Sequence, residues 1–150
     1  MKLGHVHLKV KDLDVAVNFY AALLGLKETE RLGNHFSFLS FGSAHHDIAL
    51  QALGHHATNP VQHAVGLYHS AFEVTDAQKL LDTIEKLEQL KHTYALVDHG
   101  ISWAIYTADP DGNGVEVFLD RRTAPSGLAQ WNGASRQLSK QQILTEIGRS

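Results

Sequence analysis

The sequence predicts an α+β fold of two tandem βαβββ modules, whose strands form one curled mixed sheet around a cavity, followed by a C-terminal tail with a short helix. Three observations predict it: residues 5–12 repeat at 69–76 without a gap, each copy reads as a strand leading into a helix, and three strand-like stretches follow each helix. The boundaries are about 3–53 for module 1, 54–65 for a linker, 66–120 for module 2, 1–122 for the whole repeated domain and 123–150 for the tail.

Both copies of the repeat begin with a histidine and a strand. After His5, the residues His7 and Lys9 alternate with apolar neighbours, which is the period-two pattern of a strand with one buried face. The copies end at Asp12 and Asp76, at an offset of 64 residues. Because aspartate is well suited to cap a helix N-terminus, each module is expected to open with a strand, a cap and a helix.

The two expected helices follow these aspartates directly. Their apolar residues recur at the helical period, at Leu13, Ala16, Val17, Tyr20, Leu23 and Leu24 in the first helix and at Leu80, Leu81, Ile84 and Leu87 in the second. Gly25 is expected to end the first helix, because glycine readily adopts the left-handed conformation found at helix C-termini.

Short strand-like stretches complete each module. They lie at roughly 26–31, 36–41 and 46–52 in module 1 and at roughly 93–97, 101–107 and 114–119 in module 2. Segment 109–114 is dense in turn-forming residues, which predicts a hairpin between the last two strands. In the tail, an amphipathic stretch at about 138–147 predicts the short helix, which we expect to dock on the body of the chain or on a partner subunit.

Composition narrows the classes of function. The chain has 150 residues, of which 43% are hydrophobic, and a formal net charge of -3, so we expect one globular domain without the basic surface that nucleic acid requires. No apolar run approaches the roughly 20 residues that cross a bilayer, and the N-terminus does not resemble a signal peptide. We therefore expect a cytoplasmic protein with neither a nucleic-acid nor a membrane partner.

The cysteine and histidine counts bear on metal chemistry. The sequence has no cysteine, which fits a reducing compartment and excludes disulfides and thiolate ligands. It has 11 histidines, all between His5 and His99, and histidine is the commonest transition-metal ligand. Any metal must therefore be bound through nitrogen and oxygen.

Three residues are candidate metal ligands. His5 and His69 hold equivalent positions in the repeat, so two modules that curl around one cavity would bring them face to face. Glu116 lies among apolar residues of the last strand, where a buried carboxylate needs a neutralising partner, and we match it to the end of the first module's last strand under the same 64-residue offset. Two histidines and one carboxylate are typical of non-haem Fe(II) oxygenases. The competing interpretations are an ordinary polar residue at a strand start and a solvent-facing glutamate.

Four segments of the sequence form a pattern of motifs in a fixed order. They are Gly4 to Val10, Asn18-Phe19-Tyr20 followed by Leu24-Gly25, Leu67-Tyr68-His69, and Asp109 to Glu116. In this order and spacing they resemble the vicinal oxygen chelate superfamily, which includes glyoxalase I, the fosfomycin- and bleomycin-resistance proteins and the type I extradiol dioxygenases. The resemblance covers about residues 3–120 and implies the duplicated fold with its metal inside the cavity.

Two further segments resemble single-domain type I extradiol (catechol 2,3-) dioxygenases. Residues 45–50 are similar to the dioxygenase strand that carries a histidine beside the metal site, and residues 98–102, followed by Tyr106, are similar to the segment that contacts bound catechol. The resemblance implies cleavage of a catechol-type diol with O2 at Fe(II), with His46 as the acid/base residue and His99 and Tyr106 hydrogen-bonding the substrate. A histidine near its ordinary pKa of about 6.5 can take a phenolic proton and return it. A solvated histidine pair and a core tyrosine are the ordinary alternatives.

Two other functions in the same superfamily stay open. A glyoxalase-type lyase or isomerase would use Zn(II) or Ni(II), and it normally takes a further glutamate from the first module's last strand, which here offers Asp47 and Gln51 but no glutamate. A non-catalytic small-molecule-binding protein, like the bleomycin-resistance proteins, normally lacks the metal ligands. Mn(II) also suits the proposed ligand set, because its ligand preferences overlap with those of Fe(II).

The length of the chain bears on how the cavity closes. Many extradiol dioxygenases are about twice as long, with a second pair of modules, and small single-pair relatives often dimerise. We therefore expect a homodimer, with the cavity wall completed by the partner or by residues 123–150. In that tail, Trp131 either enters the pocket or stays on the surface.

Overall fold

The computed structural model describes residues 1–61 and 63–149, which belong to two compact units. Unit 1 comprises Met1–Tyr68 and Asp109–Asn113, and unit 2 comprises His69–Ala108 and Gly114–Ser150. Each unit contains a βαβββ module, as the repeat predicts.

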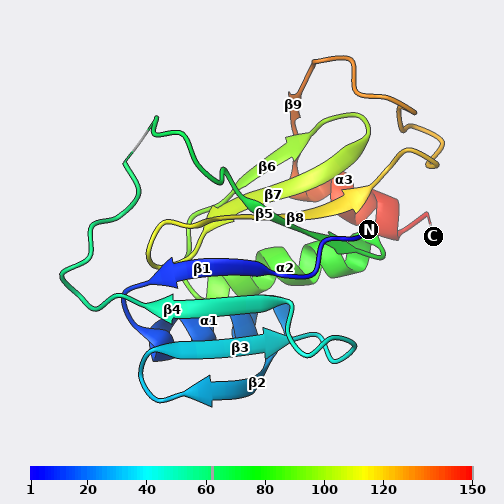
Figure 1. Cartoon of the computed structure of the whole chain (residues 1–150). Helices are drawn as coiled ribbons and strands as arrows, with labels where there is room; N and C mark the ends of the chain where they lie inside the picture. The colour runs from blue at the N-terminus through cyan, green and yellow to red at the C-terminus, as the bar shows by residue number, and fades with distance from the viewer. Residues whose placement is uncertain (62, 150) are drawn as a thin grey trace. The chain divides into compact units, whose positions relative to one another are not determined.

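Unit 1 is a four-stranded sheet with one helix on its face (Figure 1). The strand order is β1-β4-β3-β2, in which β1 and β4 run parallel and the other neighbours run antiparallel. The elements are β1 (Val6–Val10), α1 (Leu13–Leu24), β2 (Lys27–Leu32), β3 (Phe36–Ser40) and β4 (Ile48–Ala52).

Unit 2 repeats this order and adds the C-terminal tail (Figure 1). Its strand order is β5-β8-β7-β6-β9, with β5 and β8 parallel. The elements are β5 (Ser70–Val74), α2 (Ala77–Gln89), β6 (Ala95–Asp98), β7 (Ser102–Ala108), β8 (Gly114–Asp120), β9 (Arg136–Gln137) and α3 (Lys140–Ile147). The α+β class is thus confirmed, and the expected curled sheet consists of two sheets, of four and five strands, over the described residues.

Both predicted helix caps are present. The side chain of Asp12 accepts a hydrogen bond from the backbone N–H of Val15 at 3.1 Å, and that of Asp76 accepts one from Lys79 at 2.8 Å. Gly25 adopts a φ of 74° and ends α1. These contacts satisfy backbone groups that the first and last helical turns leave without intrahelical partners.

The helices bury the faces that their apolar periodicity predicts. Leu8 and Val10 of β1 point into the core of unit 1, whereas His7 and Lys9 are exposed, so the predicted alternation is confirmed. The buried helix residues are Leu13, Ala16, Phe19, Tyr20 and Leu23 in α1 and Ala77, Leu80, Leu81, Thr83, Ile84 and Leu87 in α2.

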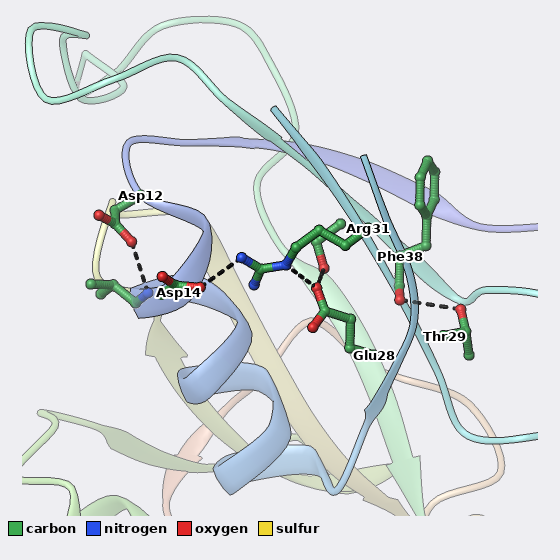
Figure 2. A network of polar contacts seen from close by, with 8 residues as sticks. Asp12, Asp14, Glu28, Thr29, Arg31 and Phe38 are labelled. Carbon is green, nitrogen blue, oxygen red and sulfur yellow. Dashed lines mark hydrogen bonds and ion pairs between the residues drawn. The ribbon is translucent and has the colours of Figure 1, made fainter. Parts of the chain in front are cut away.

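A surface network joins α1 to β2 (Figure 2). Arg31 Nη1 lies 2.7 Å from Asp14 Oδ1 in the first helical turn, and Arg31 Nε lies 2.6 Å from Glu28 Oε1. Ser37 donates to the same Glu28 oxygen at 2.7 Å. Because exposed ion pairs of this kind contribute only about 0–1 kcal/mol each, the network adds little to the stability of unit 1.

The tip of the predicted β7–β8 hairpin is part of unit 1. Tyr20, which is fully buried, donates to Asp109 Oδ2 at 3.0 Å, and the backbone N–H of Lys11 donates to Asp111 Oδ2 at 2.8 Å. Asn113 Nδ2 donates to the carbonyl oxygen of Lys9 at 3.0 Å. Burial, together with the charge of Asp109, raises the pKa of Tyr20 far above its usual range, so the phenol stays protonated and acts as the donor.

The C-terminal tail packs against the other elements of unit 2. The expected docking of the tail on the chain's own body is therefore observed. Its strand β9 pairs antiparallel with β6, and α3 packs on α2 with Ile143 fully buried. The helix begins two residues later than the predicted stretch, because Ser139 caps it and Leu138 is buried ahead of it. Within the described part of the chain, no helix combines the length and apolar character that a membrane crossing requires.

Candidate metal centre

Two of the three predicted metal ligands are in contact in unit 2. His69 Nε2 lies 2.8 Å from Glu116 Oε2, and Glu116 is 9% exposed. A carboxylate that is this buried needs a charged or hydrogen-bonding partner, and His69 supplies one. Glu116 is thus a buried carboxylate with a partner, and its role as a metal ligand stays a prediction.

Strand register explains why these side chains meet. Glu116 of β8 is the register partner of Ala71 on β5, and His69 precedes Ala71 by two positions, which puts both histidine and glutamate on one face. On the other side, Glu116 is directly opposite Tyr106 of β7. Opposed and diagonal side chains on one face lie within reach of one another, so the sheet itself assembles the group.

Tyr106 and His99 extend this group. Tyr106 Oη donates to Glu116 Oε1 at 3.0 Å, and His99 Nε2 lies 2.9 Å from Tyr106 Oη. His99 is on the turn between β6 and β7, where its backbone N–H donates to the carbonyl oxygen of Ser102. The structure therefore brings together four of the six predicted site residues in one connected series.

The other two predicted site residues lie in unit 1. The rings of His5 and His46 have centroids 4.3 Å apart, and the ring of Phe38 lies 5.0 Å from that of His46. His45 Nδ1 and His46 Nδ1 are 2.6 Å apart, so one proton lies between these two nitrogens. The adjacent histidines are therefore a hydrogen-bonded pair, in which His45 is exposed and His46 is half-buried.

The remaining nitrogen of His46 has a distinct environment. Its Nε2 is shielded from solvent and has no hydrogen-bond partner among the described residues. Burial lowers the pKa of His46, and the neighbouring His45 and His5 lower it further. Since Nδ1 is occupied by His45, Nε2 is the nitrogen that is left to contact another group.

The donor set fits a divalent metal in chemical type. Within unit 2, His69 offers an imidazole nitrogen and Glu116 a carboxylate oxygen at adjacent positions. These are ligands that Fe(II) and Mn(II) accept in proteins. Taken separately, neither unit gathers three His, Asp or Glu side chains able to hold a metal ion within residues 1–61 and 63–149.

The strand register corrects which residue of unit 1 is equivalent to Glu116. In unit 1, His7 pairs with Ala49, and in unit 2 the equivalent of His7, Ala71, pairs with Glu116. The structural equivalent of Glu116 is therefore Ala49 and not the residue at the end of β4 that the 64-residue offset indicates. The offset fails because the stretch between the helix and the last strand is longer in unit 2, so the two modules do not keep one spacing throughout.

A cavity of unit 1 lies elsewhere. It has a volume of about 670 Å³ and is bounded by β1, the linker and the hairpin tip, with Lys9, Asn59 and Asp111 among its lining residues. None of the six predicted site residues lines it. We assign it no part in the candidate centre.

Sequence reasoning missed two partners that the fold supplies. Tyr20 is hydrogen-bonded to Asp109, 89 residues along the chain. A tyrosine on an apolar helix face signals that its buried hydroxyl needs a partner, but not which residue supplies it. Ser135 Oγ lies 2.8 Å from His99 Nδ1, and no sequence signal indicates this contact because the tail has no counterpart in the repeat.

Each unit holds one βαβββ module, and unit 2 pairs a histidine with a glutamate. The family model described as the Glyoxalase/Bleomycin resistance protein/Dioxygenase superfamily matches residues 2–117. The chain belongs to this superfamily, as its motifs predicted.

Curated relatives of the chain include named dioxygenases. The catechol-2,3-dioxygenase of Bacillus subtilis (strain 168) is 30% identical over 124 residues, which are 79% of this chain and 41% of that protein. The biphenyl-2,3-diol 1,2-dioxygenase 2 of Rhodococcus globerulus is 28% identical over 134 residues, which are 88% of this chain and 70% of that protein. The chain thus spans about two fifths of the Bacillus relative.

Solved structures share the fold. A glyoxylase/bleomycin resistance protein/dioxygenase domain from Frankia sp. EAN1pec superposes with a TM-score of 0.71 at 24% identity, covering 82% of this chain and 94% of that one. A lactoylglutathione lyase from Agrobacterium tumefaciens gives 0.63 at 23% identity, covering 82% and 96%. At these identities the likeness establishes the fold and leaves the reaction to be argued from the site.

Proposed function

We propose that this protein is an extradiol ring-cleaving dioxygenase that opens a catechol-type aromatic diol with O2, using Fe(II) held by His5, His69 and Glu116. The observation that carries the proposal is the connected series from His69 through Glu116 and Tyr106 to His99. It joins a candidate ligand pair to two side chains that can donate or accept protons. The relatives named catechol- and biphenyl-diol dioxygenases support the same reaction class.

The metal would supply a Lewis-acid centre with adjacent open positions for the two diol oxygens and for O2. The chain's own groups prepare the carboxylate for this role. Tyr106 donates to Glu116 Oε1, which leaves Oε2 directed at His69. Carboxylates held in this way keep one orientation, and losing such an outer partner typically costs about 10–100-fold in metal affinity or activity.

One side chain is assigned to proton transfer and two to hydrogen-bonding the substrate. We propose that His46 takes one phenolic proton from the diol through Nε2 and returns a proton when the ring opens, because its Nδ1 is already occupied by His45. His99 and Tyr106 would hydrogen-bond the substrate on the side of Glu116. General acid–base catalysis of this kind contributes about 10²–10⁴-fold.

The register of unit 1 argues against the glyoxalase alternative. The position equivalent to Glu116 is Ala49, which is 1% exposed and has no ligating atom in its side chain. A Zn(II) or Ni(II) isomerase that needs a second carboxylate ligand from this strand would therefore lack it. The non-catalytic alternative is disfavoured by the retention of His69 and Glu116 in direct contact.

The deciding experiment is anaerobic reconstitution with Fe(II), followed by a panel of catechols and then air. A yellow ring-cleavage product is expected. Mn(II) in place of Fe(II) tests the second metal with the same ligand preference. Failure on every catechol, together with methylglyoxal–glutathione isomerisation in the presence of Ni(II) or Zn(II), would establish the glyoxalase alternative instead.

Metal affinity tests the ligands separately from turnover. The substitutions His5→Ala, His69→Ala and Glu116→Gln should each weaken Fe(II) binding by about 100-fold or more, since losing a ligand costs more than losing an outer partner. His7→Ala is the matched control, because His7 lies on the same face of the first strand as His5 and is not a proposed ligand. Equal affinity in His5→Ala and His7→Ala would remove His5 from the centre.

A homodimer and a cytoplasmic location also stay predictions. The segment that joins the two modules exposes several large apolar side chains, among them Val61, Val65 and Leu67, which supports association with a second copy. Light scattering on the purified protein tests this, and a monomer at micromolar concentration would contradict it.

A further inference from the structure

The C-terminal tail contacts the turn that carries His99. Strand β9 pairs with β6 so that Arg136 is opposite Asp98, and the backbone N–H of Leu128 donates to the carbonyl oxygen of Gly100 at 3.0 Å. A Cβ added to Gly100 would lie 2.6 Å from Leu128 Cδ1, so the tail and the turn are in close contact. Residues 128 and 136 thus connect the tail to the residues on either side of His99 in the sequence.

Two tail residues contact the His99 ring itself. Ser135 Oγ lies 2.8 Å from Nδ1, and the Trp131 ring stands perpendicular to the imidazole at a centroid distance of 6.2 Å. The indole N–H of Trp131 donates to the carbonyl oxygen of Ala134 at 2.9 Å, and the backbone N–H of Ala134 donates to Asn132 Oδ1 at 3.0 Å. These bonds fix the tail turn whose serine contacts the histidine.

The direction of each hydrogen bond follows from the donors available. An ionised Glu116 can only accept, so Tyr106 gives its single proton to Glu116. The Tyr106 oxygen must then accept from His99, which requires the proton of the neutral imidazole to be on Nε2. His99 Nδ1 is left as an acceptor, and the only proton that can fill the 2.8 Å contact is that of the Ser135 hydroxyl.

We propose that Ser135 is a positioning residue: its hydroxyl donates to His99 Nδ1 and thereby holds the imidazole with Nε2–H directed at Tyr106. This inference rests on the proposed function, because it gives the tail a part in the same site. Ser135 acts through His99 and touches no reacting atom. The tail therefore contributes a side chain to the candidate centre.

The first test reads the imidazole directly and needs no turnover. In two-bond ¹H–¹⁵N spectra of the metal-free protein, with His99→Gln used for assignment, we expect one tautomer with the proton on Nε2 and an Nδ1 resonance shifted as in a hydrogen-bond acceptor. Ser135→Ala should move that resonance to the position of a solvated imidazole, and Ser135→Thr, which keeps the hydroxyl, should restore it. Ser43→Ala, an exposed serine of unit 1, is the control and should change nothing.

A proton on Nδ1 in the unsubstituted protein, or an unchanged His99 spectrum in Ser135→Ala, would overturn the proposal. The second test uses the Fe(II) enzyme, in which Ser135→Ala should lower kcat about tenfold with Fe(II) affinity unchanged, and Ser135→Thr should recover it. An unchanged kcat in Ser135→Ala would equally contradict the positioning role. If no catechol is cleaved, the proposed function fails while the spectra still decide the contact of Ser135 with His99.

Discussion

Substituting Tyr20 by phenylalanine should destabilise the protein measurably, because it deletes one buried hydrogen bond and nothing else. Tyr20 is fully buried in α1, and its hydroxyl donates at 3.0 Å to Asp109 Oδ2 in the hairpin tip, 89 residues along the chain. A hydrogen bond to a charged group contributes about 1.5–3 kcal/mol, and phenylalanine keeps the shape of the ring. For a chain of this size, each kcal/mol shifts Tm by about 2–4 °C, so Tyr20→Phe should lower Tm by about 3–12 °C.

The matched control is Tyr94→Phe. Tyr94 also donates to a carboxylate, Glu88 Oε1 at 2.9 Å, but that pair is exposed to solvent, which replaces the lost bond. Both variants should be measured by chemical denaturation, with Tyr20→Phe lowering the midpoint at an unchanged slope and Tyr94→Phe leaving it almost unmoved. If Tyr20→Phe costs no more than Tyr94→Phe, the hairpin tip is not fastened to α1 as described.

Two further predictions concern the tail and the glycines. Gly100→Ala should destabilise the folded protein by about 1–3 kcal/mol, and by more than Gly25→Ala. Both glycines have a positive φ, but only at Gly100 would the new Cβ meet another side chain, that of Leu128. Equal unfolding midpoints of the two variants in urea would refute the close contact. The hydrogen bond from Arg121 lowers the pKa of Glu146, so its stabilising contribution is complete above the unfolded pKa of about 4.5 and is lost as pH falls through the lower folded pKa. Glu146→Gln should therefore be less stable than the unsubstituted protein at pH 7, with the difference shrinking below about pH 4.5 in a denaturation series, whereas a constant difference down to pH 2 would contradict this pairing.

Local patterns were sufficient for most of the secondary structure. The helical spacing of the apolar residues predicts which face of α1 and of α2 is buried, and the aspartates at positions 12 and 76 cap these helices as expected. Helix capping and the burial of one helix face depend on residues a few positions apart, so a short stretch of sequence is enough to predict them. The same holds for Gly25, whose φ of 74° follows from its place after the last apolar residue of the helix.

The candidate site was predicted in part. The repeat and the motifs singled out His69, Glu116, Tyr106 and His99, and the structure connects them in one series. Sequence could not supply the hydrogen-bond partners or the true counterpart of Glu116, because both depend on strand register, and a change in loop length between the modules alters register without leaving a local signal.

The sequence by itself determined the duplicated α+β fold, the starts of the two module helices and the residue types that could form a metal centre, because periodicity, capping and donor chemistry are properties of short segments. Only the tertiary structure decided which side chains meet. It paired His69 with Glu116 across parallel strands, joined Tyr20 to the hairpin tip, and brought Ser135 from the tail to His99. These contacts join residues far apart in the chain, and they form only when strand register and tail docking bring their backbones together.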